Sequence, residues 1–316
     1  MDFIKAILLA IVQGFTEFIP ISSTGHMILV EDLLRFAQDP QFITSFMVII
    51  QLPSIMAVVI YFWRDLWPFH TKGGIQEPGE NAAVVDWAAQ PPIVLRGMAL
   101  VRQLPLLRPQ GESPEDVAYQ DHMEATLLFW SKIVFAFIPA MVLGFLFADF
   151  IEEHLFSSMT VAIMLVLGGV AILLIERMRH GDRFVTVHDI NYRTAFIIGC
   201  FQCIAMIPGT SRSGASIIGG LLLGANRATA TEFSFVLAIP TMLGATVYTM
   251  VKHGVSFSPE QWQLLAVGSI VSFIVAYFSV AFLMGYIRRH SFALFAWYRI
   301  VLGGLVLLAW WMHSGG

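Results

Sequence analysis

Apolar residues occupy the chain in long runs, and short polar segments separate these runs. A helix needs about 20 apolar residues to cross the hydrocarbon core of a bilayer, which is about 30 Å thick. Six runs reach that length. The sequence therefore predicts membrane-spanning helices at residues 44–63, 126–148, 158–176, 229–251, 262–287 and 292–312.

Two further apolar runs, 3–35 and 192–225, are interrupted at their centres. Pro20 breaks the first run and Pro208-Gly209 breaks the second, because proline removes a helix hydrogen-bond donor and glycine loosens the backbone. Each half is only about 14–16 residues long, which is too short to cross a bilayer. We therefore expect two re-entrant helical hairpins rather than two kinked spans.

The two interrupted runs share an internal repeat. An Ile-Pro-x-x-Ser frame occurs in each, with Pro20 in the first and Pro208 in the second. A second proline follows each frame at a similar spacing, Pro53 after 33 residues and Pro240 after 32 residues. The frame and the later proline thus occur in the same order and at nearly the same spacing in both halves, which indicates that the two halves are copies of one unit.

The basic residues predict the orientation of these copies. Arginines follow alternate predicted spans, and the positive-inside rule places such loops in the cytoplasm. Span 44–63 then runs inward and span 229–251 runs outward, which makes the repeat inverted and brings its broken elements together near the midplane. The predicted fold is an all-α polytopic membrane protein with about six transmembrane helices and two re-entrant hairpins.

The whole chain, 1–316, is interpreted as one integral membrane domain. Its first repeat core is 1–63 and its second is 192–251, with a Pro- and Gly-rich cytoplasmic loop at 64–125. Two interpretations of residues 93–107 stay open, namely a helix on the membrane surface and a partly disordered linker.

Composition agrees with a membrane protein and excludes a nucleic-acid partner. Of 316 residues, 57% are hydrophobic and only 13% are charged, and the mean hydropathy is +0.73. The net charge of −4 provides no basic surface for a nucleic-acid backbone. The first apolar run lacks a strongly basic start and a cleavage site, so we expect it to belong to the fold. Cys200 and Cys203 are interpreted as packing residues, because no second pair completes a metal site.

The polar residues of both interruptions point to an anionic ligand. Such groups are costly at membrane depth unless they face one another or a wet cavity. Arg212 supplies a planar cation suited to phosphate oxygens, and helices that begin after Pro20 and Pro208 direct free N–H groups at the same region. Hydroxyl donors surround them: Ser22, Ser23, Thr24, Thr210, Ser211 and Ser213. A phosphate or diphosphate fits this set, although capping serines and a snorkelling arginine are the structural alternative.

Three more side chains of the first interruption carry candidate chemistry. Gln13 and Glu17 are four residues apart and share one helix face. Glu17 is a candidate ligand for a divalent cation or a candidate general base. His26 follows Ser23 by about one helical turn, so either residue is a candidate nucleophile. For Glu17 and His26 a purely structural role is the alternative.

These motifs resemble the undecaprenyl-diphosphate phosphatases, the bacitracin-resistance type of integral membrane enzyme, over essentially the whole chain. The first motif is Gln13-x-x-x-Glu17 with the residues up to His26, and the second is Pro208-Gly209-Thr210-Ser211-Arg212-Ser213-Gly214. The resemblance implies hydrolysis of undecaprenyl diphosphate to the monophosphate carrier lipid used in cell-wall synthesis. It also implies assistance by a divalent cation, Mg²⁺ or Ca²⁺, and a role for Arg299. Gln13 stands where many relatives carry glutamate, which weakens a metal-ligand role there.

The resemblance further implies a bacterial inner-membrane location with the site open to the periplasmic face. Expected partners are the membrane and a polyprenyl diphosphate lipid, and a homodimer stays open. The predicted mechanism is in-line attack by Ser23 or His26, with Ser23 slightly favoured, while Arg212 stabilises the phosphoryl oxygens and Glu17 positions the diphosphate. The predicted substrate contacts are Gln13, Thr24, Thr210, Ser211, Ser213 and Arg299.

Three other functions compete with this prediction. A secondary transporter or flippase of an anionic lipid or metabolite would also use inverted repeats with broken helices. The acid-phosphatase-like lipid phosphatases share a Ser-x-Gly-His element with residues 23–26, but they need a later histidine and aspartate that do not follow Ser211-Arg212. A structural membrane scaffold would need neither Glu17 nor Arg212 for any activity.

Overall fold

The computed structural model describes residues 2–34, 36, 38–68, 114–178, 182–254 and 256–314, with six further residues between 91 and 99. The described residues form helices and one isolated β-bridge, Phe184 with Ala225, and no strand. Within this described part, six apolar segments are long enough to cross a membrane: Pro40–Tyr61, Gln120–Ile151, Ser158–Arg177, Arg227–Lys252, Pro259–Ile287 and Ala293–His313. The protein is therefore an all-α polytopic membrane protein, and the six predicted spans are confirmed.

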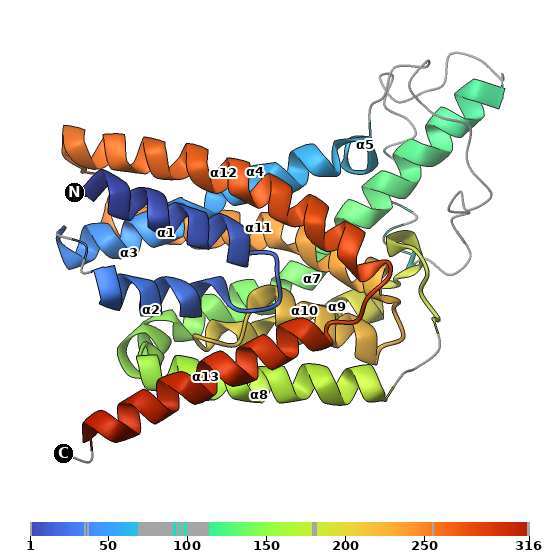
Figure 1. Ribbon diagram of the computed structural model, residues 1–316. Helices are drawn as coiled ribbons and strands as arrows, with labels where there is room; N and C mark the ends of the chain where they lie inside the picture. Colours follow the sequence, from blue (N-terminus) through green and yellow to red (C-terminus); the bar gives the residue numbers. More distant parts are fainter. Residues whose placement is uncertain are drawn as a thin grey trace.

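Figure 1 shows the order of the helices along the chain. Their bounds are α1 Asp2–Thr16, α2 Ser23–Leu34, α3 Pro40–Ile49, α4 Gln51–Tyr61, α5 Trp63–Leu66, α7 Pro114–Leu155, α8 Ser158–Arg177, α9 Tyr192–Cys203, α10 Arg212–Leu222, α11 Arg227–His253, α12 Pro259–Ile287 and α13 Ala293–Ser314, with 3₁₀ turns η3 Val187–Asp189 and η4 Ile204–Met206. Cys200 and Cys203 are free thiols.

One predicted boundary is wrong. Helix α7 begins at Pro114, inside the predicted loop 64–125, and continues for 42 residues to Leu155. Proline suits the first position of a helix. The residues that follow Pro114 are polar, so they do not belong to the apolar run from which the span was predicted, and that run begins later than the helix does. Residues 93–107 lie largely outside the described part of the chain.

Both interrupted runs fold back on themselves as helical hairpins. The first hairpin is α1 and α2, and its two outer ends meet where Gln38 donates to Asp2 at 3.0 Å. The second hairpin is α9 and α10, and the chain just beyond α10 returns to the segment before α9, where Arg183 N donates to Gly224 O at 2.8 Å. The hairpins enter from opposite ends of the molecule and their turns meet at its centre (Figure 1). Their depth in a bilayer stays a prediction.

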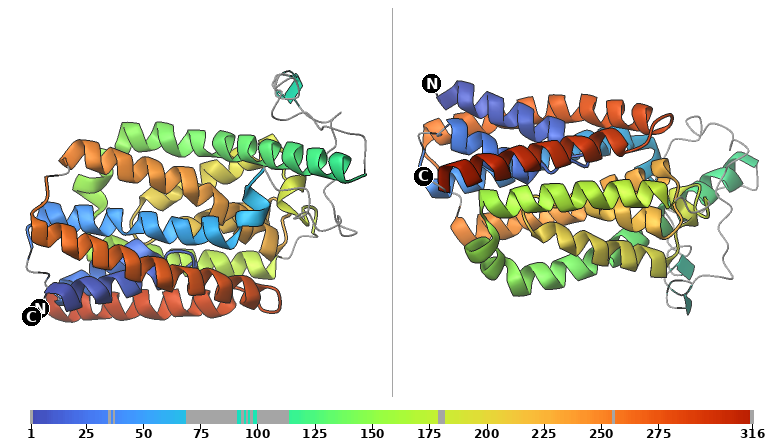
Figure 2. Two further views of the ribbon diagram at one scale, coloured as in Figure 1. Left: turned by 90° about the horizontal axis from the view of Figure 1, so that it is seen from above. Right: turned by 60° about the horizontal axis from the view of Figure 1, so that its bottom comes forward.

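The two halves of the chain repeat this order in opposite directions. In the first half a hairpin is followed by the α3–α4 span, α7 and α8, and in the second half a hairpin is followed by α11, α12 and α13. Packing between the halves is reciprocal, because α1 packs on α12 as α9 packs on α7, and α4 packs on α12 as α11 packs on α7. Both views in Figure 2 show the long helices running side by side along one axis.

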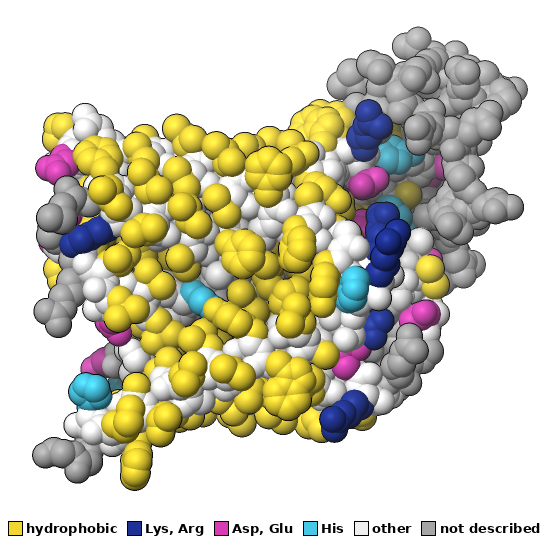
Figure 3. Space-filling view, viewed as in Figure 1, with side chains coloured by type: hydrophobic (Ala, Val, Ile, Leu, Met, Phe, Trp, Pro, Cys, Tyr) yellow, Lys and Arg dark blue, Asp and Glu magenta, His cyan; other side chains and the backbone are white. Residues whose placement is uncertain are grey.

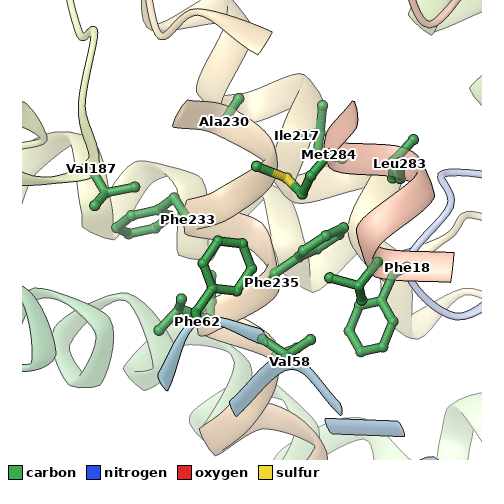
Figure 4. Close-up of a cluster of buried hydrophobic side chains, with 14 of the residues drawn as sticks. Phe18, Val58, Phe62, Val187, Ile217, Ala230, Phe233, Phe235, Leu283 and Met284 are labelled. Carbon is green, nitrogen blue, oxygen red and sulfur yellow. The ribbon is translucent and has the colours of Figure 1, made fainter. Parts of the chain in front are cut away.

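The surface and the core explain how this bundle is held. Apolar side chains cover the middle of the face in Figure 3, while charged side chains gather towards its ends. Beneath that surface, Phe18 follows α1 and packs edge-on against Phe235 of α11 with ring centroids 5.0 Å apart. Figure 4 shows both rings within a cluster that also includes Val58, Phe233 and Met284. The first turn is therefore anchored to a helix of the other half.

Candidate active site

The two hairpin turns have the same backbone conformation. Ser22 and Ser211 have φ angles of 74° and 76°, and they are the two non-glycine residues with positive φ in the part of the chain that the structure describes. Each precedes a helix and caps it in the same way. Ser22 Oγ accepts a hydrogen bond from Gly25 N at 3.3 Å, and Ser211 Oγ accepts one from Gly214 N at 3.1 Å. Such backbone strain concentrates at functional sites.

This equivalence corrects the repeat frame by one residue. The Ile-Pro-x-x-Ser frame aligned Ser23 with Ser211, whereas the shared turn aligns Ser22 with Ser211 and therefore Ser23 with Arg212. The frame failed because it matched the two prolines, and the backbone instead places Pro20 opposite Gly209. At this equivalent position the first turn thus carries the Ser23 hydroxyl and the second turn carries the Arg212 guanidinium.

Glu17 joins the two turns. Its Oε2 accepts hydrogen bonds from Gln13 Nε2 and from Ser23 Oγ, both at 2.6 Å, and its Oε1 accepts one from Arg212 Nη2 at 3.2 Å. The Glu17 side chain is only 2% exposed. In so dry a place a carboxylate needs a cation and hydrogen-bond donors, and these three residues supply both.

Arg212 is held from three sides. Besides Glu17, its Nη1 donates to Ser234 O at 2.9 Å, and its guanidinium carbon lies 5.7 Å from the centre of the Phe18 ring. Its Nε is buried and has no hydrogen-bond partner among the residues that the structure describes. The guanidinium is thus oriented by protein groups.

A cavity of about 240 Å³ brings most of the predicted site residues together. Its lining includes six of the candidate polar residues: Glu17, Ser22, Ser23, Thr24, Ser211 and Arg212. Two predicted contacts lie behind this lining. Ser213 is fully buried and its hydroxyl donates to Ile19 O at 3.3 Å, while Thr210 Oγ1 is buried and hydrogen-bonds none of the described residues.

His26 faces away from this cluster. Its Nδ1 hydrogen-bonds Ser22 O at 2.8 Å, and its Nε2 hydrogen-bonds the Tyr298 hydroxyl at 2.8 Å, with the two rings stacked at 5.6 Å. The sequence placed His26 beside Ser23, but residues three apart on a helix still differ by about 60° in direction. Ser23 instead has Glu17 as its partner, a pairing that sequence spacing did not indicate.

Arg299 ties the two turns to each other. It is fully buried and donates to Pro20 O and Gly209 O, both at 3.1 Å, which are equivalent carbonyls of the two turns. It also donates to two carbonyls of α8, Met164 O at 3.0 Å and Leu165 O at 3.3 Å. These bonds support a positioning role. Direct substrate contact by Arg299 stays a prediction that this geometry does not favour.

The arrangement offers limited ligands for a divalent cation. Within the described residues, no three His, Cys, Asp or Glu side chains are grouped closely enough to hold a metal. Gln13 Oε1, however, is buried next to Glu17 and accepts no hydrogen bond from the part of the chain that the structure describes. One carboxylate and one amide oxygen fit a cation whose remaining ligands are substrate phosphate oxygens and water, which is how Mg²⁺ is commonly bound.

The chain is similar to known proteins over nearly its whole length. The family model described as bacitracin resistance protein BacA matches residues 6–305. The chain is 44% identical over 309 residues to an undecaprenyl-diphosphatase of Pseudomonas aeruginosa strain PAO1, covering 98% of this chain and 94% of that protein. It is 39% identical over 311 residues to an undecaprenyl-diphosphatase of Enterococcus faecalis, covering 98% of this chain and 97% of that protein.

Proposed function

The chain belongs to the bacitracin resistance protein BacA family, and from this membership and the site geometry we propose that it is an enzyme that hydrolyses undecaprenyl diphosphate to undecaprenyl phosphate and inorganic phosphate. The observation that carries the proposal is Glu17, which bonds a hydroxyl from one turn and a guanidinium from the other. Those are the groups that phosphoryl transfer needs, namely a nucleophile beside a base and a cation for the phosphoryl oxygens.

In the proposed mechanism Ser23 is the nucleophile. Its Oγ attacks the terminal phosphorus in line while Glu17 Oε2, at 2.6 Å, accepts the hydroxyl proton. A Ser23 O–P bond forms, the bond from that phosphorus to the bridging oxygen breaks, and the lipid monophosphate leaves. Water then cleaves the phosphoserine and releases inorganic phosphate. Arg212 stabilises the negative charge on the phosphoryl oxygens in both steps.

Glu17 and the Gln13 amide oxygen are the groups that would hold a divalent cation, either Mg²⁺ or Ca²⁺. Bound there with the diphosphate, such a cation would neutralise phosphate charge.

We also propose that this multi-pass protein lies in the bacterial inner membrane with its site open to the periplasmic face. One end of the bundle carries arginines: Arg64 follows α4, Arg177 is the last residue of α8 and Arg288 follows α12. The positive-inside rule assigns this end to the cytoplasm. The site cavity is also lined by Phe156, in the turn between α7 and α8 at the other end. A homodimer stays a prediction without a structural argument.

Phosphate release from undecaprenyl diphosphate by the purified protein in detergent tests the proposal. We expect turnover by the wild type and a loss of about 10³-fold in kcat for Arg212→Ala, the size typical for an arginine that stabilises transferring phosphate. Glu17→Gln keeps the side-chain shape but removes the base, and we expect a similar loss.

A matched control is Arg227→Gln. Arg227 forms an ion pair with Glu176 at 2.6 Å, and neither residue lines the site cavity, so its loss should leave kcat unchanged. A transporter would release no phosphate in detergent, where no gradient exists. A scaffold would show no difference between Arg212→Ala and Arg227→Gln, and either result would contradict the proposal.

A further inference from the structure

An apolar groove lies beside the polar cavity. It has a volume of about 400 Å³ and runs between α7, the end of the second hairpin and α11. Its walls are mostly apolar, and they include Phe137, Met141 and Phe145 of α7. Phe145 is 79% exposed and Met141 is 51% exposed, so the groove opens sideways on the surface that faces lipid in a membrane-spanning bundle.

The groove and the polar cavity adjoin each other. They share the lining residues Ala205, Met206, Arg212, Thr241 and Ala245. Arg212 stands at the junction, with one face towards Glu17 and with its unpartnered Nε buried. A ligand whose anionic end contacts Arg212 would therefore enter the groove directly with its apolar part.

Small residues keep the groove open. Gly144 on α7 and Gly244 on α11 both line it. A methyl group added at Gly144 would lie 3.8 Å from the flexible end of Met206, and one added at Gly244 would lie 3.2 Å from the Phe137 ring. Larger side chains at these positions would occupy the space that a ligand uses.

We propose that this groove binds the first isoprene units of the lipid diphosphate substrate and so selects substrates by their prenyl chain, an inference that rests on the proposed function. A prenyl chain is the occupant that matches both parts of the combined cavity, because it is apolar and is joined to a diphosphate at one end. A pocket of this size holds only the proximal part of a long chain, and the sideways opening leaves the rest in the bilayer.

The inference is tested by the substrate chain-length preference of a variant in which a larger side chain fills the groove. The substrates are dimethylallyl diphosphate, with one isoprene unit, and farnesyl diphosphate, with three. For Gly144→Leu we expect kcat/KM for farnesyl diphosphate to fall about tenfold, since a few methylene contacts in an apolar pocket are worth that much. The value for dimethylallyl diphosphate should change less than twofold. Gly285→Leu is the matched control, because Gly285 lies on α12 with open space around it.

Photolabelling provides a readout besides activity. A farnesyl diphosphate analogue with a photoreactive group on its second isoprene unit should label residues 137–148 or 241–248, and excess undecaprenyl diphosphate should suppress the labelling. Labelling confined to α12 or α13, or an unchanged farnesyl-to-dimethylallyl ratio in Gly144→Leu, would overturn the groove assignment while leaving the proposed hydrolysis intact. Absence of phosphate release from every substrate by the wild type would instead refute the proposed function.

Discussion

The two hairpin turns share a backbone and differ in charge. Equivalent glutamines, Gln13 and Gln202, lie on the first arms of the two hairpins, and each is buried with an unpartnered Oε1. Gln13 donates to Glu17, whereas the position equivalent to Glu17 is Met206 and Gln202 donates to Thr241. The first turn thus carries the carboxylate, and the second carries a guanidinium at the position equivalent to Ser23.

This difference shows how a duplicated unit can build an asymmetric site. Two identical turns that met at the centre would bring like charges together, which is unfavourable in a dry environment. With Glu17 on one turn and Arg212 on the other, the meeting turns form an ion pair at 3.2 Å. The shared backbone conformation determines where the side chains of each turn point. The differences in sequence between the turns determine which chemical group each one places in the site.

The largest effect on activity is expected at Ser23, the position where the first turn carries a hydroxyl and the second turn carries Arg212. Ser23→Ala should reduce kcat by about 10⁴-fold or more, because removal of a nucleophile has effects of that size. Its neighbour Ser22 is the control. Ser22 lines the same cavity, but its hydroxyl caps Gly25 N and does not bond Glu17. For Ser22→Ala we expect about 1 kcal/mol of lost stability with kcat within tenfold of wild type. A phosphorylated intermediate trapped on His26 instead would contradict the assignment.

The second test concerns the link between the turns. Arg299→Met would remove four hydrogen bonds to backbone carbonyls, two of them in the turns, and we expect a loss of about 3–5 kcal/mol in stability, seen as a lower Tm in detergent. If the turns are positioned by Arg299 and the substrate does not contact it, kcat should fall while KM changes little. A stable variant whose only defect is a raised KM would show direct substrate binding.

The smallest expected effect is at Tyr298, which belongs to neither turn. Tyr298→Phe removes the hydroxyl that bonds His26 Nε2 at 2.8 Å but keeps the stacked ring. Since His26 faces away from Glu17 and Arg212, we expect kcat to change less than about fivefold, the scale of one ordinary hydrogen bond. A loss comparable to that of Ser23→Ala would mean that His26 takes part in the chemistry.

The sequence predicted the architecture well because hydrophobicity and proline act locally. Long apolar runs define spans, and Pro20 and Pro208 define the turns, so six helices and two hairpins could be expected before any coordinates. The convergence of Glu17, Ser23 and Arg212 also followed from the inverted order of the repeats. These features depend on chain direction and segment length alone.

Other features depend on side-chain direction and could not be predicted in this way. The Ser23–Glu17 hydrogen bond forms across a turn whose strained φ at Ser22 has no sequence signature beyond serine itself. The orientation of His26 depends on Tyr298, 272 residues away in the chain. Arg299 resembled an ordinary charge in the last span, and only the positions of Pro20 O and Gly209 O reveal its partners.

The position of Arg299 in the chain has a consequence for biosynthesis. Both turns depend on a residue of α13, which leaves the ribosome after each of the other helices described above. Helices α1 and α2 can insert early, but their turn lacks this anchor until α13 has been made. A chain that stalled before α13 would therefore be inserted yet inactive, and competence would arise only after α13 had been synthesised.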